Sequence, residues 1–198
     1  MSSSATDAKA ALRARVLAAR RSRSAASQLA GQARVRASLV DLVRHQHVHL
    51  AAAYVPVGGE PGGAELPDVL AAALAPAGRL LLPVLRPDLD LDWAQYTGPG
   101  TLVAAGRGLR EPGGPRLGPA AIRAAMLVVV PALAVDRAGR RLGRGGGSYD
   151  RALARTDPAA LTVALLHDGE IVDAVPAEPH DQPVRAVITP SEGLRLLS

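Results

Sequence analysis

The chain has 198 residues, no cysteine, no phenylalanine and a formal net charge of +5. This length suits one domain with a sizeable core, and the lack of cysteine excludes disulfides, thiolate metal sites and a cysteine nucleophile. The basic balance favours anionic partners, but aromatic residues make up only 2% of the chain, which is few for a protein that stacks on nucleic-acid bases.

Residues 1–6 are expected to form a disordered tail, and residues 7–198 a single domain. A helical pattern runs from Asp7 to Arg21, with Asp7 placed to cap the free N–H groups at its start. Lys9 and Arg13 are spaced i and i+4, so both side chains can meet one anion. Two alternatives remain: a merely solvated basic face, or an arginine-rich mitochondrial transit peptide.

A second helix is predicted from Ser24 to Arg44, with Ser24 as its N-cap. His45, His47 and His49 follow, and three alternate imidazoles on a strand could in principle meet a metal. No nearby carboxylate completes such a site, so a polar entry into the strand from Val48 to Val55 is the favoured interpretation.

Glu60 follows that strand, before a helix from Ala64 to Ala75. A carboxylate just past the carboxyl end of a parallel strand lies where open α/β sheets bind ligands, so Glu60 is a candidate site residue. Further strands are predicted at Leu80–Val84 and at Leu89–Tyr96. The second contains Trp93, which we expect in the core rather than stacked on a ligand ring, and the Pro- and Gly-rich segment 98–119 is expected to be a connecting loop.

The stretch from Met126 to Arg155 is the most informative part of the chain. Its run Met126–Val130 has no polar face, which is typical of a strand covered by helices on both sides. Glycines 143, 145, 146 and 147 then precede a helical pattern that starts at Ser148. Backbone N–H groups in such a loop can surround an anion, so the order strand, glycine loop, helix indicates a phosphate site.

Charged side chains support this interpretation. Arg140, Arg141 and Arg144 lie in or beside the loop, and Asp150 could hold a metal ion that shares the phosphate. The loop lacks the Lys-Ser/Thr pair of the Walker motif, and a mobile glycine-rich surface loop is the alternative. Strands at Leu161–Leu166, Ile171–Val172 and Val184–Ile188 complete the prediction of an α/β fold with a mainly parallel sheet flanked by helices.

The segment PALAVDRAGRRLGRGGGSYDRAL resembles the signature of the 5-formyltetrahydrofolate cyclo-ligase family, approximately P-x-x-A-F-D-x-x-G-x-R-L-G-x-G-x-G-Y-Y-D. The matching residues are Pro131, Ala134, Asp136, Gly139, Arg141, Leu142, Gly143, Gly145, Gly147, Tyr149 and Asp150. Val135 stands where the family usually has Phe, and Ser148 where it has the first of two tyrosines. Outside the signature, Gly108–Pro112 resembles the family's Gly-Ile-x-Glu-Pro.

The resemblance implies an enzyme that cyclises 5-formyltetrahydrofolate to 5,10-methenyltetrahydrofolate, consuming ATP with Mg²⁺ and releasing ADP and phosphate. It implies ATP contacts at the N-terminal Lys-x-x-x-Arg and along the glycine loop, with Arg141 and Arg144 stabilising the transferring phosphoryl group. The implied ATP-binding residues are Lys9, Arg13, Arg141, Leu142, Gly143, Arg144, Gly145, Gly146, Gly147, Ser148 and Tyr149.

The same resemblance implies folate contacts and a metal pair. The folate contacts are Val55, Glu60, Arg144, Gly145, Gly146, Gly147 and Ser148, and the magnesium carboxylates are Asp150 and Asp181, the latter in Pro176–Asp181. The usual acidic-Thr pair after the glutamate is replaced by Pro61-Gly62-Gly63.

Two other classes of function stay open at this point. The departures from the family pattern also fit a folate- or nucleotide-binding paralogue without turnover, and the net charge fits a basic nucleic-acid-binding module. No apolar run approaches the roughly 20 residues that span a bilayer, and no signal peptide is evident. We therefore expect a cytoplasmic monomer whose partners are small molecules, without nucleic acid or membrane.

Overall fold

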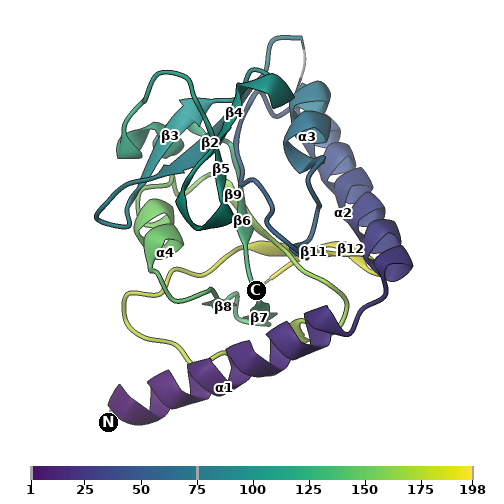
Figure 1. Cartoon of the computed structure of the whole chain (residues 1–198), viewed down its shortest axis with the longest axis vertical. Helices are drawn as coiled ribbons and strands as arrows, with labels where there is room; N and C mark the ends of the chain where they lie inside the picture. Colours follow the sequence, from purple (N-terminus) through teal and green to yellow (C-terminus); the bar gives the residue numbers. More distant parts are fainter. Residues whose placement is uncertain (1, 75, 198) are drawn as a thin grey trace.

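A computed structural model describes residues 2–74 and 76–197 (Figure 1). Its main sheet has the strand order β12-β11-β9-β6-β1-β2-β3. The five inner strands are parallel to one another, and the two edge strands β12 and β3 are antiparallel to their neighbours. In chain order the strands are β1 (Leu50–Ala52), β2 (Arg79–Leu85), β3 (Leu91–Gln95), β6 (Leu127–Pro131), β9 (Leu161–Leu165), β11 (Ala186–Thr189) and β12 (Gly193–Leu196). The predicted α/β fold with a mainly parallel sheet is therefore confirmed.

Two small sheets accompany the main one. One has the order β10-β7-β8 and the other pairs β4 with β5. Their strands are β4 (Leu102–Ala104), β5 (Arg110–Pro112), β7 (Ala134–Asp136), β8 (Arg141–Leu142) and β10 (Ile171–Val172). The sequence suggested that the segment 98–119 is a connecting loop. Its middle instead forms the two-stranded β4–β5 ribbon.

Helices cover both faces of the main sheet. The α-helices are α1 (Ser2–Arg21), α2 (Ala25–His45), α3 (Leu66–Leu74) and α4 (Ser148–Leu153), and the 3-10 helices are η1 (Pro99–Thr101), η2 (Gly106–Gly108) and η3 (Pro119–Ala124). Helices α2 and α3 lie on one face and α4 with η3 on the other, while α1 crosses the end of the molecule beside β7 and β8 (Figure 1). None of the described helices is long and apolar enough to cross a membrane.

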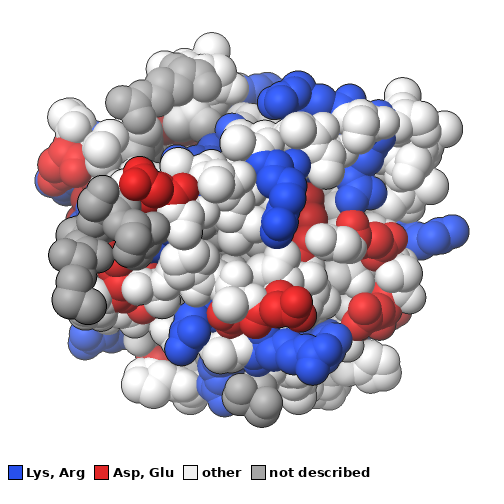
Figure 2. Space-filling model, turned by 90° about the horizontal axis from the view of Figure 1, so that it is seen from below, with Lys and Arg blue, Asp and Glu red and all other residues white. Residues whose placement is uncertain are grey.

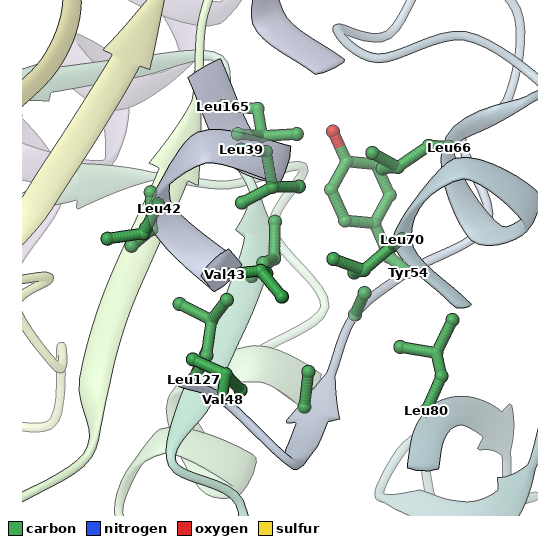
Figure 3. Packing of buried hydrophobic residues seen from close by; sticks show 14 of the residues in the cluster. Leu39, Leu42, Val43, Val48, Tyr54, Leu66, Leu70, Leu80, Leu127 and Leu165 are labelled. Atoms are coloured by element: carbon green, nitrogen blue, oxygen red, sulfur yellow. The ribbon is translucent and has the colours of Figure 1, made fainter. Parts of the chain in front are cut away.

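The apolar run in β6 is buried on both faces, as its sequence predicts. Leu127 and Val129 belong to the cluster under α2 and α3, whereas Val128 and Val130 belong to the cluster under α4 and η3. On the first face the Tyr54 ring lies among the leucines of α3 (Figure 3), and its hydroxyl donates to the Pro61 carbonyl at 2.8 Å. Trp93 is buried in the second cluster, in accordance with the expected core role.

The first two helices differ in how well the sequence predicted their starts. Helix α2 begins after Ser24, whose hydroxyl accepts from the Ser27 N–H at 3.2 Å, which is the expected cap. Helix α1 instead begins at Ser2, so residues 2–6 are helical rather than the expected disordered tail, and Asp7 is not a cap. The segment contains no Gly or Pro to interrupt helical hydrogen bonding.

A buried ion pair fastens α1 to the rest of the molecule. Arg20 and Glu170 are both almost fully buried, with Nε and Oε1 2.8 Å apart, and Arg20 Nη2 also donates to the Ala132 carbonyl at 2.6 Å. Glu170 accepts from the backbone N–H of His167 at 2.8 Å. The His167 ring then reaches the Gly59 carbonyl at 2.8 Å, so one buried polar chain joins α1 to the loop after β1.

We expect Glu170→Gln to lower the free energy of unfolding by about 3 kcal/mol, because it leaves the Arg20 guanidinium buried without a counter-charge. Urea unfolding followed by circular dichroism measures this. The control is Glu192→Gln, which removes a more exposed pair with Arg195 and should cost less than about 1 kcal/mol. Equal losses in the two variants would contradict a structural role for the buried pair.

Candidate active site

The order of the parallel strands places a crevice at the carboxyl ends of β1 and β6. From β1 the chain proceeds to β2 on one side, and then returns to β6, β9 and β11 on the other side. The loops after β1 and β6 therefore diverge, and open α/β sheets bind ligands where such loops separate. A cavity of about 630 Å³ lies there, within the size range of small-molecule sites.

All of the predicted site residues line this one cavity. They come from α1, from the loop after β1, from the segment β8 to α4 and from the loop before β11. These residues are Lys9, Arg13, Val55, Glu60, Arg141, Leu142, Gly143, Arg144, Gly145, Gly146, Gly147, Ser148, Tyr149, Asp150 and Asp181. The structure thus brings together residues that lie up to 172 positions apart in the sequence.

The glycine loop begins at a hairpin that the sequence did not predict. Strands β7 and β8 pair antiparallel, and the chain then passes through Gly145 and Gly147 with φ of 105° and 67°. These left-handed conformations favour glycine because a Cβ would clash with the backbone. Gly147 is the N-cap of α4, so the loop feeds directly into Ser148 and Asp150.

Helix α1 brings two cations to the loop. Arg13 Nε donates to the Gly143 carbonyl at 2.9 Å, which fixes the guanidinium beside the glycines. Lys9 Nζ lies 2.7 Å from both Glu178 Oε2 and Asp181 Oδ2. Lys9 and Arg13 therefore leave one helical face together, as their spacing predicts, and neither belongs to a merely solvated surface.

Two carboxylates and their neighbours form a group suited to a hard cation. Asp150 Oδ1 accepts from Arg141 Nη2 at 2.8 Å and from the Gln182 N–H at 3.4 Å, so Asp150 lies beside the segment that carries Asp181. Ligand atoms of Glu178, His180 and Asp181 lie within 4.8 Å of one another. Carboxylate oxygens are the protein ligands that Mg²⁺ prefers. The Glu178 and Asp181 carboxylates fit that ion, and Asp150 lies beside their segment but outside this close group.

Ion pairing sets the charge states of Lys9, Glu178 and Asp181. Burial disfavours the Lys9 ammonium, but hydrogen bonds to Asp181 and Glu178 outweigh burial and raise the pKa of Lys9. Burial likewise opposes ionisation of Asp181, yet Lys9 and the Glu178 N–H hold the pKa of Asp181 below its usual value. The Lys9 hydrogen bond also lowers the pKa of Glu178. All three groups are therefore charged near neutral pH.

The loop after β1 supplies a buried carboxylate at the other side of the glycine loop. Glu60 is only 6% exposed. Its Oε1 lies 3.0 Å from Arg144 Nη2, and its Oε2 accepts from the Val57 N–H at 3.0 Å. The unusual Gly62 and Gly63 that follow adopt φ of 92° and 65°, so the altered sequence after Glu60 forms a tight glycine turn.

The cavity also contains residues that the sequence analysis did not assign. Glu178 and His180 stood in the recognised Pro176–Asp181 motif, and Glu111 in Gly108–Pro112, so motif position was an available signal for them. The remaining lining residues are Tyr54, Val57, Pro83, Leu85, Leu91, Leu109, Arg110, Pro131, Ala132 and Leu133. Of these, Leu109 and Arg110 also stand in Gly108–Pro112 and residues 131–133 in the signature segment, whereas tertiary packing alone brings in the others.

Some noted residues lie away from the cavity. Val135, which replaces the family's usual Phe, is fully buried in the core cluster under α4. His45, His47 and His49 are exposed at the end of α2 and before β1, and among the described residues they form no metal-binding group. A second hollow of about 480 Å³ lies at the opposite, amino ends of β6 and β9, beside Met126 and Leu161.

The fold and this cavity define a doubly wound α/β protein with a glycine loop, cations and carboxylates at its topological switch point. Comparison with known proteins places it more closely. The family model for the 5-formyltetrahydrofolate cyclo-ligase family matches residues 5–190. The chain belongs to this enzyme family.

Individual relatives agree with that membership. The chain is 50% identical over 147 residues to the 5-formyltetrahydrofolate cyclo-ligase of Mycolicibacterium smegmatis, covering 72% of this chain and 74% of that protein. It is similar in structure to the 5,10-methenyltetrahydrofolate synthetase of Aquifex aeolicus, with a TM-score of 0.78, 27% identity and coverage of 96% and 92% of the two chains. The Mycoplasma pneumoniae 5,10-methenyltetrahydrofolate synthetase shares the fold at 18% identity, with a TM-score of 0.71 and coverage of 90% and 96%.

Because Gly147 adopts a left-handed conformation, we expect Gly147→Ala to lower the free energy of unfolding by about 1 to 2 kcal/mol. An added Cβ would also lie 3.1 Å from Arg151 Nη1. Gly146→Ala is the matched control, since its Cβ would meet only the Ser148 hydroxyl at an ordinary 3.5 Å. Chemical denaturation of both variants measures the difference, and identical stabilities would show that the loop relaxes out of this conformation.

Proposed function

We propose that this protein catalyses the ATP-dependent cyclisation of 5-formyltetrahydrofolate to 5,10-methenyltetrahydrofolate, with release of ADP and phosphate. The observation that carries the proposal is the single cavity in which the glycine loop, its cations and the carboxylates meet an apolar wall. The end with the glycine loop and its cations suits phosphates. The end with the apolar wall suits a heterocycle joined to a benzoyl group. Membership of the cyclo-ligase family supports the same reaction.

The reaction can proceed without a nucleophile from the protein. The formyl oxygen attacks the γ-phosphorus of ATP, and the bond to the ADP oxygen breaks. N10 of the folate then attacks the activated formyl carbon, N10 loses its proton, and the C–O bond breaks to release phosphate. The protein therefore contributes positioning and charge neutralisation, which dominate phosphoryl transfer.

The glycine loop and the basic side chains would hold the nucleotide. Backbone N–H groups of the segment from Gly143 to Tyr149 can surround the phosphates, while Lys9 and Arg13 approach from α1. Arg141 precedes the loop and Arg144 lies within it, and they pair with Asp150 and Glu60 respectively. We assign these two arginines to the charge that develops on the transferring phosphoryl group. The ATP-binding set also includes Leu142 and Ser148, which border the loop.

Asp150 and Asp181 would hold Mg²⁺, which supplies charge neutralisation at the transferring phosphoryl group when bound. In this structure each carboxylate has a cation as its partner, Arg141 for Asp150 and Lys9 for Asp181. Binding of MgATP would therefore exchange partners, with the metal at the carboxylates and the two side-chain cations free to turn to phosphate oxygens.

The folate would lie between the glycine loop and the loop after β1. Val55 lines this side with apolar surface, and Glu60 can accept hydrogen bonds from the amino group and ring nitrogens of the pterin. The folate contacts also include Arg144, Gly145, Gly146, Gly147 and Ser148. We further propose that the enzyme acts as a cytoplasmic monomer.

Purified protein mixed with 5-formyltetrahydrofolate, ATP and Mg²⁺ tests the proposal, because the methenyl product has its own absorbance. We expect product formation that requires all three components and releases one ADP for each product molecule. Binding of both substrates without product would instead support the paralogue lacking turnover. Binding to nucleic acid alone would support the basic module, although Figure 2 shows basic and acidic side chains intermixed on the face that it displays, unlike a continuous basic stripe.

We expect Asp150→Asn to reduce kcat on the order of 100-fold, while folate affinity changes little, because it removes a charge that acts on the transferring phosphoryl group. Steady-state kinetics at limiting Mg²⁺ and equilibrium folate binding separate the two effects. Asp173→Asn, at an exposed position outside the cavity, is the control. Near-parental turnover by Asp150→Asn at limiting Mg²⁺ would remove Asp150 from the metal site.

Ser148 is the one family departure in the signature that lines the cavity. An aromatic ring stacked on a partner ring contributes about 0.5 to 1.5 kcal/mol, so Ser148→Tyr should lower the folate KM roughly 2- to 13-fold with little change in kcat. Ser27→Tyr, exposed on α2, is the control. An unchanged folate KM in a folded Ser148→Tyr protein would place the pterin away from Ser148.

A further inference from the structure

The cations of the cavity differ in whether a carboxylate already neutralises them. Among the described residues, five Lys or Arg side chains line the cavity. Lys9 is paired with Glu178 and Asp181, Arg141 with Asp150, and Arg144 with Glu60. The two that pair with no carboxylate of the described chain are Arg13 and Arg110.

Arg13 and Arg110 belong to different ends of the cavity. Arg13 is bound to the Gly143 carbonyl at 2.9 Å, and its Cζ would lie 3.7 Å from a Cβ placed on Gly145. It is therefore part of the glycine-loop end. Arg110 lies on β5 and its one recorded hydrogen bond is long, 3.4 Å from Nη2 to the Leu102 carbonyl of the paired strand β4. This guanidinium is exposed and retains most of its donors for a ligand.

The part of the cavity wall next to the strand that carries Arg110 is mainly apolar, apart from Glu111. The cavity wall at this end is formed by aliphatic residues from the loop after β1, from β2, from β3 and from the segment before β5. These residues are Val55, Val57, Pro83, Leu85, Leu91 and Leu109. The part of a ligand that contacts this wall must be largely uncharged. A ligand that also binds Arg110 at the rim must carry a negative charge at the end that reaches the rim.

The strand that carries Arg110 is held in place. The neighbouring Glu111 accepts from the Leu85 N–H through Oε1 at 2.9 Å, which ties β5 to the carboxyl end of β2. A cation on an anchored strand loses less conformational freedom when it binds than one on a free loop. Arg110 thus extends from an anchored strand at the rim of the apolar wall.

We propose that Arg110 binds the carboxylates of the glutamate tail of the folate. This inference rests on the proposed function, since it assigns the ligand's two ends to the two ends of one cavity. The pterin and benzoyl groups contact the uncharged wall, and the glutamate, a dianion at neutral pH, reaches the guanidinium at the rim. A planar guanidinium can hold a carboxylate through two parallel N–H···O bonds.

The test compares two ligands and two charge-matched variants in equilibrium binding without ATP. The ligands are 5-formyltetrahydrofolate and 5-formyltetrahydropteroate, which has the pterin and benzoyl groups but no glutamate. The variants are Arg110→Gln and the control Arg34→Gln, at an exposed position on α2 outside the cavity. Isothermal titration at low and high salt measures each affinity.

We expect the parent and Arg34→Gln to prefer the glutamate-bearing ligand, and Arg110→Gln to lose that preference. The loss should be about 3- to 10-fold for 5-formyltetrahydrofolate at low salt, as for an exposed but bidentate ion pair, and absent for the pteroate. Arg110→Lys should retain part of the preference, because it keeps the charge without the planar fork.

Two results would overturn the assignment while leaving the proposed function intact. Equal weakening of both ligands by Arg110→Gln would mean that Arg110 acts on the pterin or benzoyl part or on the fold of β5. Unchanged affinity for both ligands would mean that the glutamate lies elsewhere. If the parent binds neither ligand, the proposed function itself fails, and the glutamate subsite fails with it.

Discussion

The reversal of strand order between β1 and β6 is the constraint on which the site depends. Because β2 lies on one side of β1 and β6 on the other, the loops that leave β1 and β6 turn away from each other. The glycine loop then occupies one wall of the opening and Glu60 the other. Helix α1 closes the opening from the end of the molecule, where Leu12 and Val16 pack on Leu133, and it adds Lys9 and Arg13. No single element contains the site, so its geometry is a property of the sheet.

Charge balance within the cavity follows from the same arrangement. Three of its cations are held by carboxylates that converge from distant parts of the chain, and the Lys9 contacts join residues 169 and 172 positions apart. Such pairs limit the cost of placing several like charges in one hollow. In the proposed binding of MgATP, Lys9 and Arg141 would exchange their carboxylate partners for phosphate oxygens. Among the described residues that line the cavity, Arg13 and Arg110 are the cations that no carboxylate neutralises.

Local patterns in the sequence were sufficient for the main elements. The run Leu127–Val130 indicated a central strand because both faces of β6 are covered, and Ser24 indicated the start of α2 because its hydroxyl caps the helix. Spacing along one helix was sufficient to place Lys9 and Arg13 together. Val55 and Glu60 follow the carboxyl end of β1, and the segment with the glycine loop follows that of β6, so these motif residues converge at one edge of the sheet.

The elements that escaped prediction are those created by pairing between short segments. Strands β7 and β8 have three and two residues, too few for a period-2 pattern to appear, and β4, β5 and β12 owe their conformation to the neighbour that each one meets. Residues such as Tyr54 and Leu85 have no local signal of function, because only the tertiary packing places them at the cavity. The ion pairs that Lys9 makes with Glu178 and Asp181 likewise appear only in the folded chain.

The buried chain from Arg20 to Gly59 shows how the two walls are kept in register. Arg20 lies on the helix that carries Lys9 and Arg13, and its partner Glu170 receives the backbone N–H of His167. The carbonyl of Gly59 must accept from the His167 ring, which requires the Nε2–H form, and burial supports a neutral ring because it lowers the pKa of His167. Gly59 precedes Glu60, the residue proposed to contact the folate. A shift of α1 away from the sheet would therefore strain the loop that carries Glu60. Helix α1 and the loop after β1 are thus positioned against each other by buried hydrogen bonds.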